Sequence, residues 1–264
     1  MDCEQPQRVV VIGANGKTGF HLVRMLHQHP NYSTLAMIRA ADQATRFEEL
    51  GVDWTTGDLE AGSPSVEALE GADAVIFAAG AGRDRPNIKK VSIDYLGAIK
   101  AIASAQETKS VKRFLLLSGI NTDPLGTRRS VNSSDLDGPL AAWHRLKAHS
   151  ETYLRESHVH GRALDWTILC PGRLVDEGEV GTGLVKASLI HGEEDLKETL
   201  SEEERAAAVK VMPGSHDGKS ERLCVSRYNT AAALMALLGA PNTIEKSVTL
   251  VDGILPVEEA LSIV

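Results

Sequence analysis

VVVIGANGKTG, residues 9–19, is the stretch of sequence that decides the fold of this chain. A β-branched apolar run ends at three glycines, Gly13, Gly16 and Gly19, and an apolar pattern of helical period follows. This order predicts a buried parallel strand, a tight turn and a helix. In such a unit the first glycine permits the bend, the second lets a diphosphate approach the backbone, and the third lets the helix pack against the strand. The helix N-terminus offers N–H groups and a partial positive charge, so the stretch predicts a dinucleotide-binding loop.

A second feature indicates which dinucleotide is bound. Residues 34–39 (TLAMIR) form an apolar run that ends on Arg39, about 20 residues beyond Gly19, where this fold places the residue that contacts the adenosine ribose. Folds that prefer NAD place an acid there to hold the ribose 2′-hydroxyl, whereas an arginine accepts the 2′-phosphate of NADP. Arg39 therefore favours NADP(H) as the cofactor. The alternative is a solvated arginine at the end of a strand.

Composition is typical of a soluble globular protein. The 264 residues suit one doubly wound domain with a small appendage, and 42% hydrophobic and 24% charged residues are ordinary proportions. A net charge of -8 disfavours nucleic acid or an anionic membrane as a partner. The chain has no apolar run long enough to span a membrane, and its N-terminus is too polar for a signal peptide. We therefore expect a cytoplasmic protein. The 3 cysteines are widely spaced with no CxxC pair, so neither a disulfide framework nor a metal site is expected.

Strand and helix patterns alternate along the chain. Strand-like apolar runs stand at residues 9–12, 34–39, 52–56, 74–79, 113–117, 164–169 and, as the last strand, 247–251. The longest helical patterns cover residues 91–106, 140–157 and, behind a serine cap, 226–238. This alternation predicts an α/β fold, a doubly wound parallel sheet (Rossmann fold) with helices on both faces. Ligands of such sheets lie beyond the carboxyl ends of the strands, which selects the loops that begin at Gly13, Arg39, Gly57, Gly80, Ser118 and Pro171.

The alternation loosens in the last third of the chain. We expect a single domain over residues 1–264, in which residues 176–225 form a small C-terminal substrate or lid region. Residues 192–211 are charged and amphipathic, which predicts one solvated helix that ends at Pro213-Gly214. A lid over a substrate pocket is the alternative interpretation of the same stretch.

Several short motifs occur in the order typical of one superfamily. They are GANGKTG, the strand that ends in Arg39, Gly57-Asp58-Leu59, Phe77-Ala78-Ala79-Gly80, Leu116-Leu117-Ser118, Pro171-Gly172-Arg173 and Ser226-Arg227. Over residues 8–251 the chain resembles the atypical short-chain dehydrogenase/reductase superfamily, in particular its NAD(P)H-binding group related to NmrA-like proteins and to flavin (biliverdin-IXβ) reductase.

This resemblance implies a set of cofactor contacts. The glycine loop would hold the diphosphate and Arg39 the 2′-phosphate. Asp58 and Leu59 would lie at the adenine, and Ala79 with Gly80 at the ribose. The expected cofactor-binding residues are Gly13, Asn15, Gly16, Lys17, Thr18, Gly19, Arg39, Asp58, Leu59, Ala79, Gly80, Ser118, Lys147 and Pro171.

The resemblance to the superfamily is less complete for the catalytic residues than for the cofactor contacts. Typical members of the superfamily use a serine after the fifth strand and a YxxxK pair on the next helix, where the tyrosine transfers a proton while hydride moves at the nicotinamide. This chain has Ser118 and Lys147, but Trp143 stands four residues before the lysine, and an indole is not an acid. The neighbouring His144 is of a type that titrates near neutrality and is the candidate proton donor. We therefore expect Ser118, His144 and Lys147 to be catalytic.

Each of these side chains also has a plainer possible role. Trp143 packs in the core or, with Tyr95 on the preceding helix, forms a wall of a flat apolar substrate pocket. His144 is alternatively a polar surface residue, Lys147 a ribose contact without a catalytic role, and Ser118 a cap after its strand.

Three functions remain open from the sequence. The first is an NADPH-dependent oxidoreductase that reduces a small aromatic, carbonyl or quinone-type substrate, and it is preferred because Ser118 and Lys147 are retained. The second is a non-catalytic sensor of the NADP(H) redox state that acts through partner proteins, which the missing tyrosine suits. The third is an isomerase or epimerase that uses the bound nucleotide without net turnover. We expect a monomer or homodimer that takes a small-molecule substrate.

Overall fold

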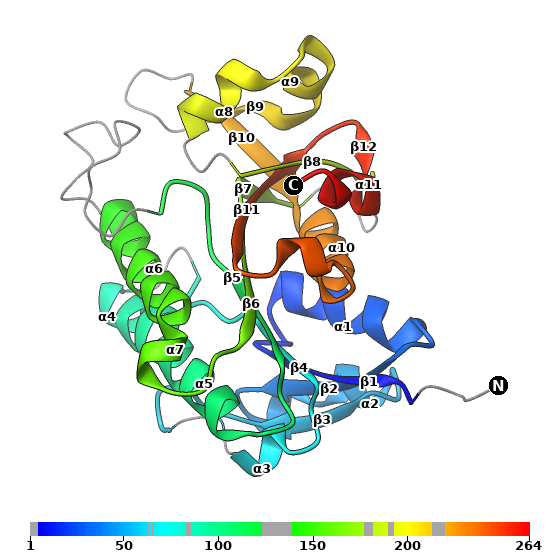
Figure 1. Ribbon diagram of the computed structural model, residues 1–264, viewed down its shortest axis with the longest axis vertical. Helices are drawn as coiled ribbons and strands as arrows, with labels where there is room; N and C mark the ends of the chain where they lie inside the picture. Colours follow the sequence, from blue (N-terminus) through cyan, green and yellow to red (C-terminus); the bar gives the residue numbers. More distant parts are fainter. Residues whose placement is uncertain are drawn as a thin grey trace.

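Parallel strands at the centre of the fold carry the apolar runs of the sequence (Figure 1). The computed structural model describes residues 5–62, 64, 66–82, 86–122, 139–176, 182–189, 193–212 and 220–264. The strands of the main sheet are β1 (Gln7–Ile12), β2 (Tyr32–Ile38), β3 (Asp53–Thr56), β4 (Ala74–Phe77), β5 (Arg113–Leu117), β6 (Asp165–Pro171), β8 (Leu184–Ser188), β11 (Lys246–Asp252) and β12 (Leu255–Pro256). Within the described residues these nine strands have the order β12-β8-β11-β6-β5-β4-β1-β2-β3, and β8 alone runs against its neighbours.

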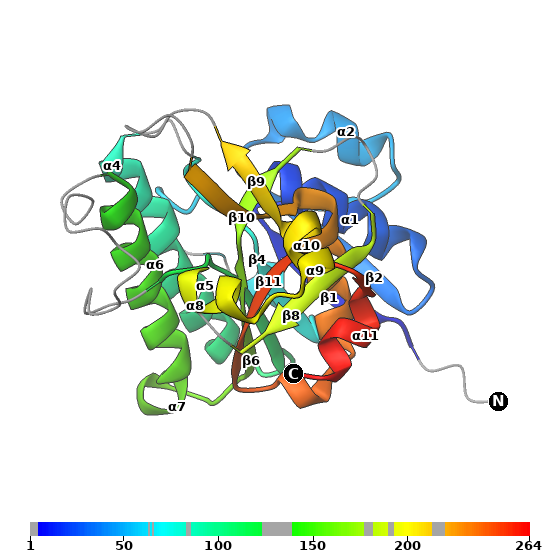
Figure 2. The same cartoon turned by 90° about the horizontal axis from the view of Figure 1, so that it is seen from above.

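Helices cover both faces of this sheet (Figure 2). One face carries α1 (Lys17–Gln28), α2 (Thr45–Glu48), α10 (Arg227–Leu238) and α11 (Val257–Ser262), and the other carries α3 (Val66–Leu69), α5 (Leu96–Glu107), α6 (Pro139–Arg155) and α7 (Ser157–His160). Successive residues of a strand point to opposite faces, so Val9 and Val11 pack with α1 while Val10 and Ile12 pack with α5. Both sets are buried, as a parallel sheet covered on two sides requires. The predicted doubly wound sheet is confirmed.

The helix predicted over residues 91–106 begins earlier and is irregular. It starts with the short α4 (Asn87–Lys89), continues as a π-helical turn over Lys90–Tyr95, and becomes α5 at Leu96. The wider turn brings Asp94 inward, where the residue is 2% exposed and its carbonyl oxygen accepts a hydrogen bond from Ser150 Oγ at 3.0 Å. Such π-turns are frequent at functional sites.

The single solvated helix predicted over residues 192–211 is wrong in the described part of that stretch. The chain forms α8 (Glu193–Thr199), α9 (Glu202–Ala208) and the strand β9 (Val209–Met212). Ser201 divides the two helices because its side chain and that of Glu204 form a reciprocal capping box. Leu196 and Ala208 are fully buried, so this segment packs against the sheet rather than standing in solvent. Residue 192 and the expected stop at Pro213-Gly214 lie outside the described residues.

A second, smaller sheet was not predicted. It has three strands within the described residues, β7 (Arg173–Val175), β10 (Ser220–Ser226) and β9, in the order β7-β10-β9. These strands are short or carry many polar residues, so their sequences lack the apolar runs that mark the central strands. For the same reason β8 was missed, and β12 and α11 follow the strand at 247–251 that was expected to be the last.

The turn between β1 and α1 is packed more closely than any side chain would allow. A Cβ atom on Gly13, whose φ is +85°, would lie 2.6 Å from Ala79 Cα, and one on Gly19 would lie 2.4 Å from Gly13 O. Both neighbours are backbone atoms that have little freedom to move. The fold therefore requires glycine at these two positions.

We predict that Gly19→Ala lowers the free energy of unfolding by about 1–3 kcal/mol, because the added methyl group overpacks the contact with Gly13. Urea unfolding of the variant measures this loss. Gly62→Ala is the matched control, because a Cβ atom there meets no atom of the described residues within 4 Å. Equal stability of the two variants would show that the turn relaxes without cost.

Candidate functional site

The loops after β1 and β4 meet at the point where the sheet reverses its winding. β1 lies between β2 and β4, so its crossover helix and that of β4 cover opposite faces and leave a crevice at the carboxyl ends. The missing side chain of Gly13 lets Ala79 and Gly80 lie beside the β1–α1 turn. The structure thus brings together the first and fourth of the predicted cofactor loops.

The N-terminus of α1 is open toward this crevice. Gly16 is its N-cap, no side chain caps the helix, and the first helical hydrogen bond runs from Phe20 N to Gly16 O at 2.8 Å. A Cβ atom on Gly16 would meet only Gly13 O, at 3.2 Å, so packing does not demand glycine here as it does at Gly19. The exposed position suits the approach of an anion to the N–H groups of the first turn. The residues present therefore fit a diphosphate.

Two cations stand beside this helix end and share one carboxylate. Lys17 Nζ donates to Asp176 Oδ2 at 2.6 Å, and Arg227 donates to Asp176 Oδ1 at 2.7 Å. The hydrogen bond from Lys17 is the main cause that holds the pKa of Asp176 below its usual value. Asp176 and Arg227 were not predicted as site residues, because the contact joins positions far apart in the sequence.

The predicted adenosine side contains one arginine that the sequence singled out and one that it did not. Arg39 is exposed at the end of β2, and its backbone N–H donates to Gln43 Oε1 at 3.1 Å. Arg46 donates to Asn15 Oδ1 at 3.2 Å, and its guanidinium lies 3.1 Å from the ring centre of Phe20. Asn15 is therefore held beside the glycine loop by a neighbouring helix.

Asp58 and Leu59 have structural partners within the chain. Asp58 Oδ1 accepts the backbone N–H of Glu60 at 2.9 Å, which is the contact of an Asx turn. Leu59 is buried and would lie 3.1 Å from a Cβ atom on Gly97. The side chain of Leu59 therefore belongs to the core, and an adenine contact from these two residues remains a prediction.

Asp94 is the central site residue that the sequence did not reveal. Its carboxylate accepts the Ala81 N–H at 2.9 Å and the Trp143 Nε1–H at 3.2 Å, and it lies 3.5 Å from Lys147 Nζ. Lys147 also donates to Leu117 O at 3.0 Å. One buried carboxylate thus joins the loop after β4 to the two positions on α6 that correspond to the YxxxK pair.

Trp143 lies across the end of β5. A Cβ atom on Gly119 would be 2.7 Å from the edge of the indole ring, so the ring rests directly on the backbone after Ser118. Tyr95 does not join it in any described contact, because the tyrosine ring pairs with the exposed His149 at a centroid distance of 6.1 Å. Both remain predicted substrate residues, with Trp143 the better placed.

The Ser118 hydroxyl points into the protein. It donates to Glu151 Oε1 at 2.5 Å, and Glu151 in turn pairs with Arg155 at 2.8 Å. Pro171 is buried as the last residue of β6. Ser118 therefore has a structural partner, and its predicted catalytic role finds no support in this geometry.

His144 is neutral at physiological pH. Burial of its imidazole, with the positive charge of Arg222 as a second cause, lowers the pKa of His144 from 6.5 to about 4. A neutral imidazole has no surplus proton to donate. This counts against the prediction that His144 is the proton donor.

Comparison with known proteins agrees with this arrangement. A family model described as NAD(P)H-binding matches residues 13–203. The UPF0659 protein YMR090W of Saccharomyces cerevisiae is 31% identical, with 96% of this chain and 97% of that protein covered. The uncharacterized sugar epimerase YhfK of Bacillus subtilis is 30% identical, with 96% and 98% covered. A solved Bacillus halodurans protein, provisionally assigned as an NAD-dependent epimerase/dehydratase, superposes with a TM-score of 0.73 at 26% identity, covering 98% and 100%. The chain belongs to the NAD(P)H-binding family, whose members bind a nicotinamide dinucleotide on a Rossmann-type sheet.

Two further observations concern the described residues only. None of their helices is long and apolar enough to cross a membrane. They contain no group of three or more His, Cys, Asp or Glu side chains arranged to hold a metal ion.

We predict that Gly16→Val abolishes binding of the dinucleotide while the protein stays folded. A branched side chain there would occupy the space that the diphosphate needs, whereas the one close neighbour of its Cβ atom among the described residues is the carbonyl oxygen of Gly13. Calorimetric titration with NADPH, beside a thermal melt, tests both parts. Normal folding with normal binding would mean that the glycine loop is only a turn.

We also predict that Asp94→Asn destabilises the protein by about 3 kcal/mol, because it leaves the Lys147 ammonium buried without its charge partner. In a double-mutant cycle, Asp94→Asn combined with Lys147→Met should cost clearly less than the sum of the single changes. Urea unfolding of the four proteins gives the coupling. Strict additivity would show that the two side chains do not form a functional pair.

Proposed function

We propose that this chain is an NADPH-dependent reductase of small, flat acceptors, in which the protein binds and orients the reactants but does not supply the proton. The observation that carries this proposal is the state of Trp143. Trp143 occupies the position at which short-chain dehydrogenase/reductases have their catalytic tyrosine. The one N–H group of its indole donates a hydrogen bond to Asp94.

Cofactor binding follows from the chain's own residues. The N–H groups of the first turn of α1 would hold the diphosphate, and Arg39 at the end of β2 would hold the 2′-phosphate. When bound, the reduced nicotinamide supplies the hydride. Lys147, with its ammonium fixed by Leu117 O and Asp94, is the residue of α6 best placed to contact the cofactor ribose.

Of the predicted catalytic residues, neither Ser118 nor His144 is suited to donate a proton at neutral pH. The Ser118 hydroxyl is committed to Glu151, and His144 is neutral. Quinones, flavins and conjugated carbonyl compounds suit such a site, since their reduced forms take the proton from water. The indole of Trp143 on Gly119 supplies a flat surface for a ring of this kind.

The sequence leaves two other functions open, an epimerase and a redox sensor. The name of YhfK points to sugar epimerisation, a reaction in which a base must take the proton of a sugar hydroxyl group. In this chain Trp143 occupies the position of that base. A redox sensor without turnover suits the same tryptophan equally well, and turnover decides between sensor and reductase.

The experiment is to follow the absorbance of NADPH with a panel of quinones, flavins and aromatic ketones. The proposal expects oxidation of NADPH by at least one member of the panel. Tight binding of NADPH without turnover of any acceptor would favour the sensor.

Arg39→Ala is expected to lower the affinity for NADPH about tenfold and to leave that for NADH unchanged, because only NADPH carries the 2′-phosphate. Calorimetry on both proteins with both cofactors measures the difference. Arg24→Ala, an equal change of charge on the exposed face of α1, is the control. Equal affinity of the unaltered protein for the two cofactors would remove this assignment.

His144→Gln is expected to leave kcat nearly unchanged at pH 7 and the rate profile unaltered between pH 6 and 8, since a group with a pKa of about 4 does not titrate there. The folded-state pKa lies below the ordinary value of 6.5, so protonation favours the unfolded state. Stability contributed by neutral His144 is therefore complete above pH 6.5 and is lost as the pH falls toward 4. The glutamine variant should lack that loss. A large fall in kcat would restore His144 as the proton donor.

A further inference from the structure

Strand β10 packs against the carboxyl end of β6. A Cβ atom on Gly172, the residue after β6, would be 2.6 Å from Leu223 O of β10. β10 also pairs with β7 through Cys224 and Arg173. The residue before Leu223, Arg222, is therefore placed at the carboxyl edge of the sheet beside β5 and β6.

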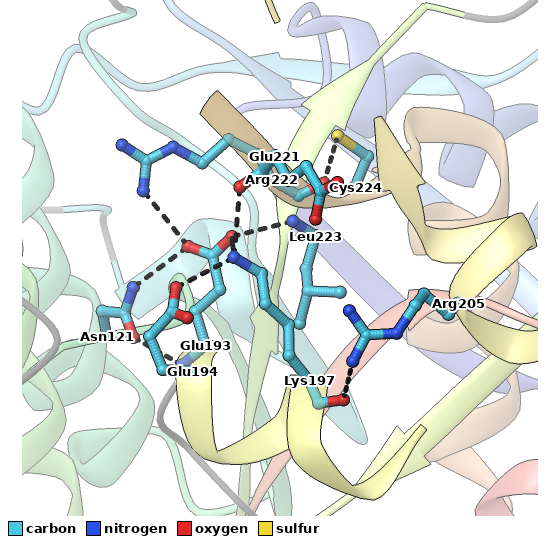
Figure 3. Close-up of polar contacts among 9 residues, drawn as sticks. All are labelled: Asn121, Glu193, Glu194, Lys197, Arg205, Glu221, Arg222, Leu223 and Cys224. Atoms are coloured by element: carbon cyan, nitrogen blue, oxygen red, sulfur yellow. Dashed lines mark hydrogen bonds and ion pairs between the residues drawn. The ribbon is translucent and has the colours of Figure 1, made fainter. Parts of the chain in front are cut away.

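A buried carboxylate fixes this strand to the loop after β5 (Figure 3). Glu193, 5% exposed, accepts the Leu223 N–H at 2.8 Å, and its own N–H donates to Asn121 Oδ1 at 2.8 Å. Asn121 has a φ of 67°, in the left-handed region that few side chains adopt, and it follows Ser118 by three residues. These contacts hold the strained loop, α8 and β10 in one arrangement.

Among the described residues, the one partner of the Arg222 guanidinium is Glu193. Its side chain is 40% exposed, and its Nη1 lies 3.5 Å from Glu193 Oε2, an ion pair longer than a good hydrogen bond. Figure 3 shows the other terminal nitrogen pointing away from the cluster. Glu193 Oε1 also lies 3.6 Å from Lys197 Nζ, so Glu193 is divided between two cations. It therefore engages one of the several N–H donors of the Arg222 guanidinium.

The guanidinium also lies within electrostatic range of α6. Its charge is the second cause of the lowered pKa of His144, the residue next to Trp143. Trp143 lies at Gly119, and Arg222 is joined through Glu193 to Asn121, so an apolar ring and a cation both lie near the residues that follow β5.

We propose that Arg222 binds a carboxylate of the substrate, so that the acceptor is a flat, conjugated acid rather than a neutral ring. This deepens the proposed reductase function and rests on it. Trp143 would contact the ring, and the planar guanidinium would pair with the carboxylate, the geometry for which arginine is suited.

The test is calorimetric binding of 2-naphthoate and of the uncharged 2-naphthamide to the protein saturated with NADP⁺. The unaltered protein should bind the naphthoate more tightly, and added salt should weaken this preference. Arg222→Gln should reduce naphthoate affinity about 10- to 100-fold and leave naphthamide affinity unchanged. Arg205→Gln, which removes an arginine that donates to Lys197 O in the same cluster, is the control and should change neither.

Glu193→Gln gives a test of opposite sign. Removal of the Glu193 carboxylate, which competes for Arg222, should raise the affinity for naphthoate. If Arg222 only stabilises the fold, this affinity should not rise. The proposal would be overturned if naphthoate does not bind, or if Arg222→Gln lowers the affinities for naphthoate and naphthamide equally. Because binding is measured without turnover, a naphthoate preference in a protein that oxidises no NADPH would support a carboxylate-binding site at Arg222 and remove the reductase.

Discussion

The close approach of the β1–α1 turn to the end of β4 is the constraint on which the rest of the site depends. Gly13 has no side chain, so its backbone can lie against Ala79, and Gly19 lets α1 pack over the same turn. This contact sets the position of the helix N-terminus and of the loop after β4. A methyl group on either glycine would push the turn away from the backbone atoms that it now contacts. The proposed diphosphate site is therefore a consequence of backbone packing.

On the other side of the crevice a buried carboxylate has the same organising role. Asp94 lies on a π-helical turn that directs it inward, and from there it holds Ala81, Trp143 and Lys147. The tryptophan is thereby part of a fixed polar network. The network fixes Lys147 and places Trp143, rather than a tyrosine, four residues before it. For this reason our proposal separates hydride transfer from proton supply.

The central fold was predictable because its strands are apolar runs and its first turn is marked by glycines at fixed spacing. The edges were not. β7, β9 and β10 are stabilised by pairing with each other, and Ser201 divides a stretch whose charge pattern alone indicates one helix. The loops at the carboxyl ends of the strands were likewise predictable from the sequence, but the contacts of Asp94, Asp176 and Arg222 join residues distant along the chain. Only the folded structure shows that Ser118 faces Glu151 and that burial keeps His144 neutral.

The most direct test of the central claim is the crystal structure of the protein with NADPH. Our account predicts the diphosphate on the N–H groups at the start of α1, the 2′-phosphate at Arg39, and the nicotinamide at the end of β5 beside Trp143. A diphosphate placed away from Gly16, or a nicotinamide that does not reach β5, would contradict it.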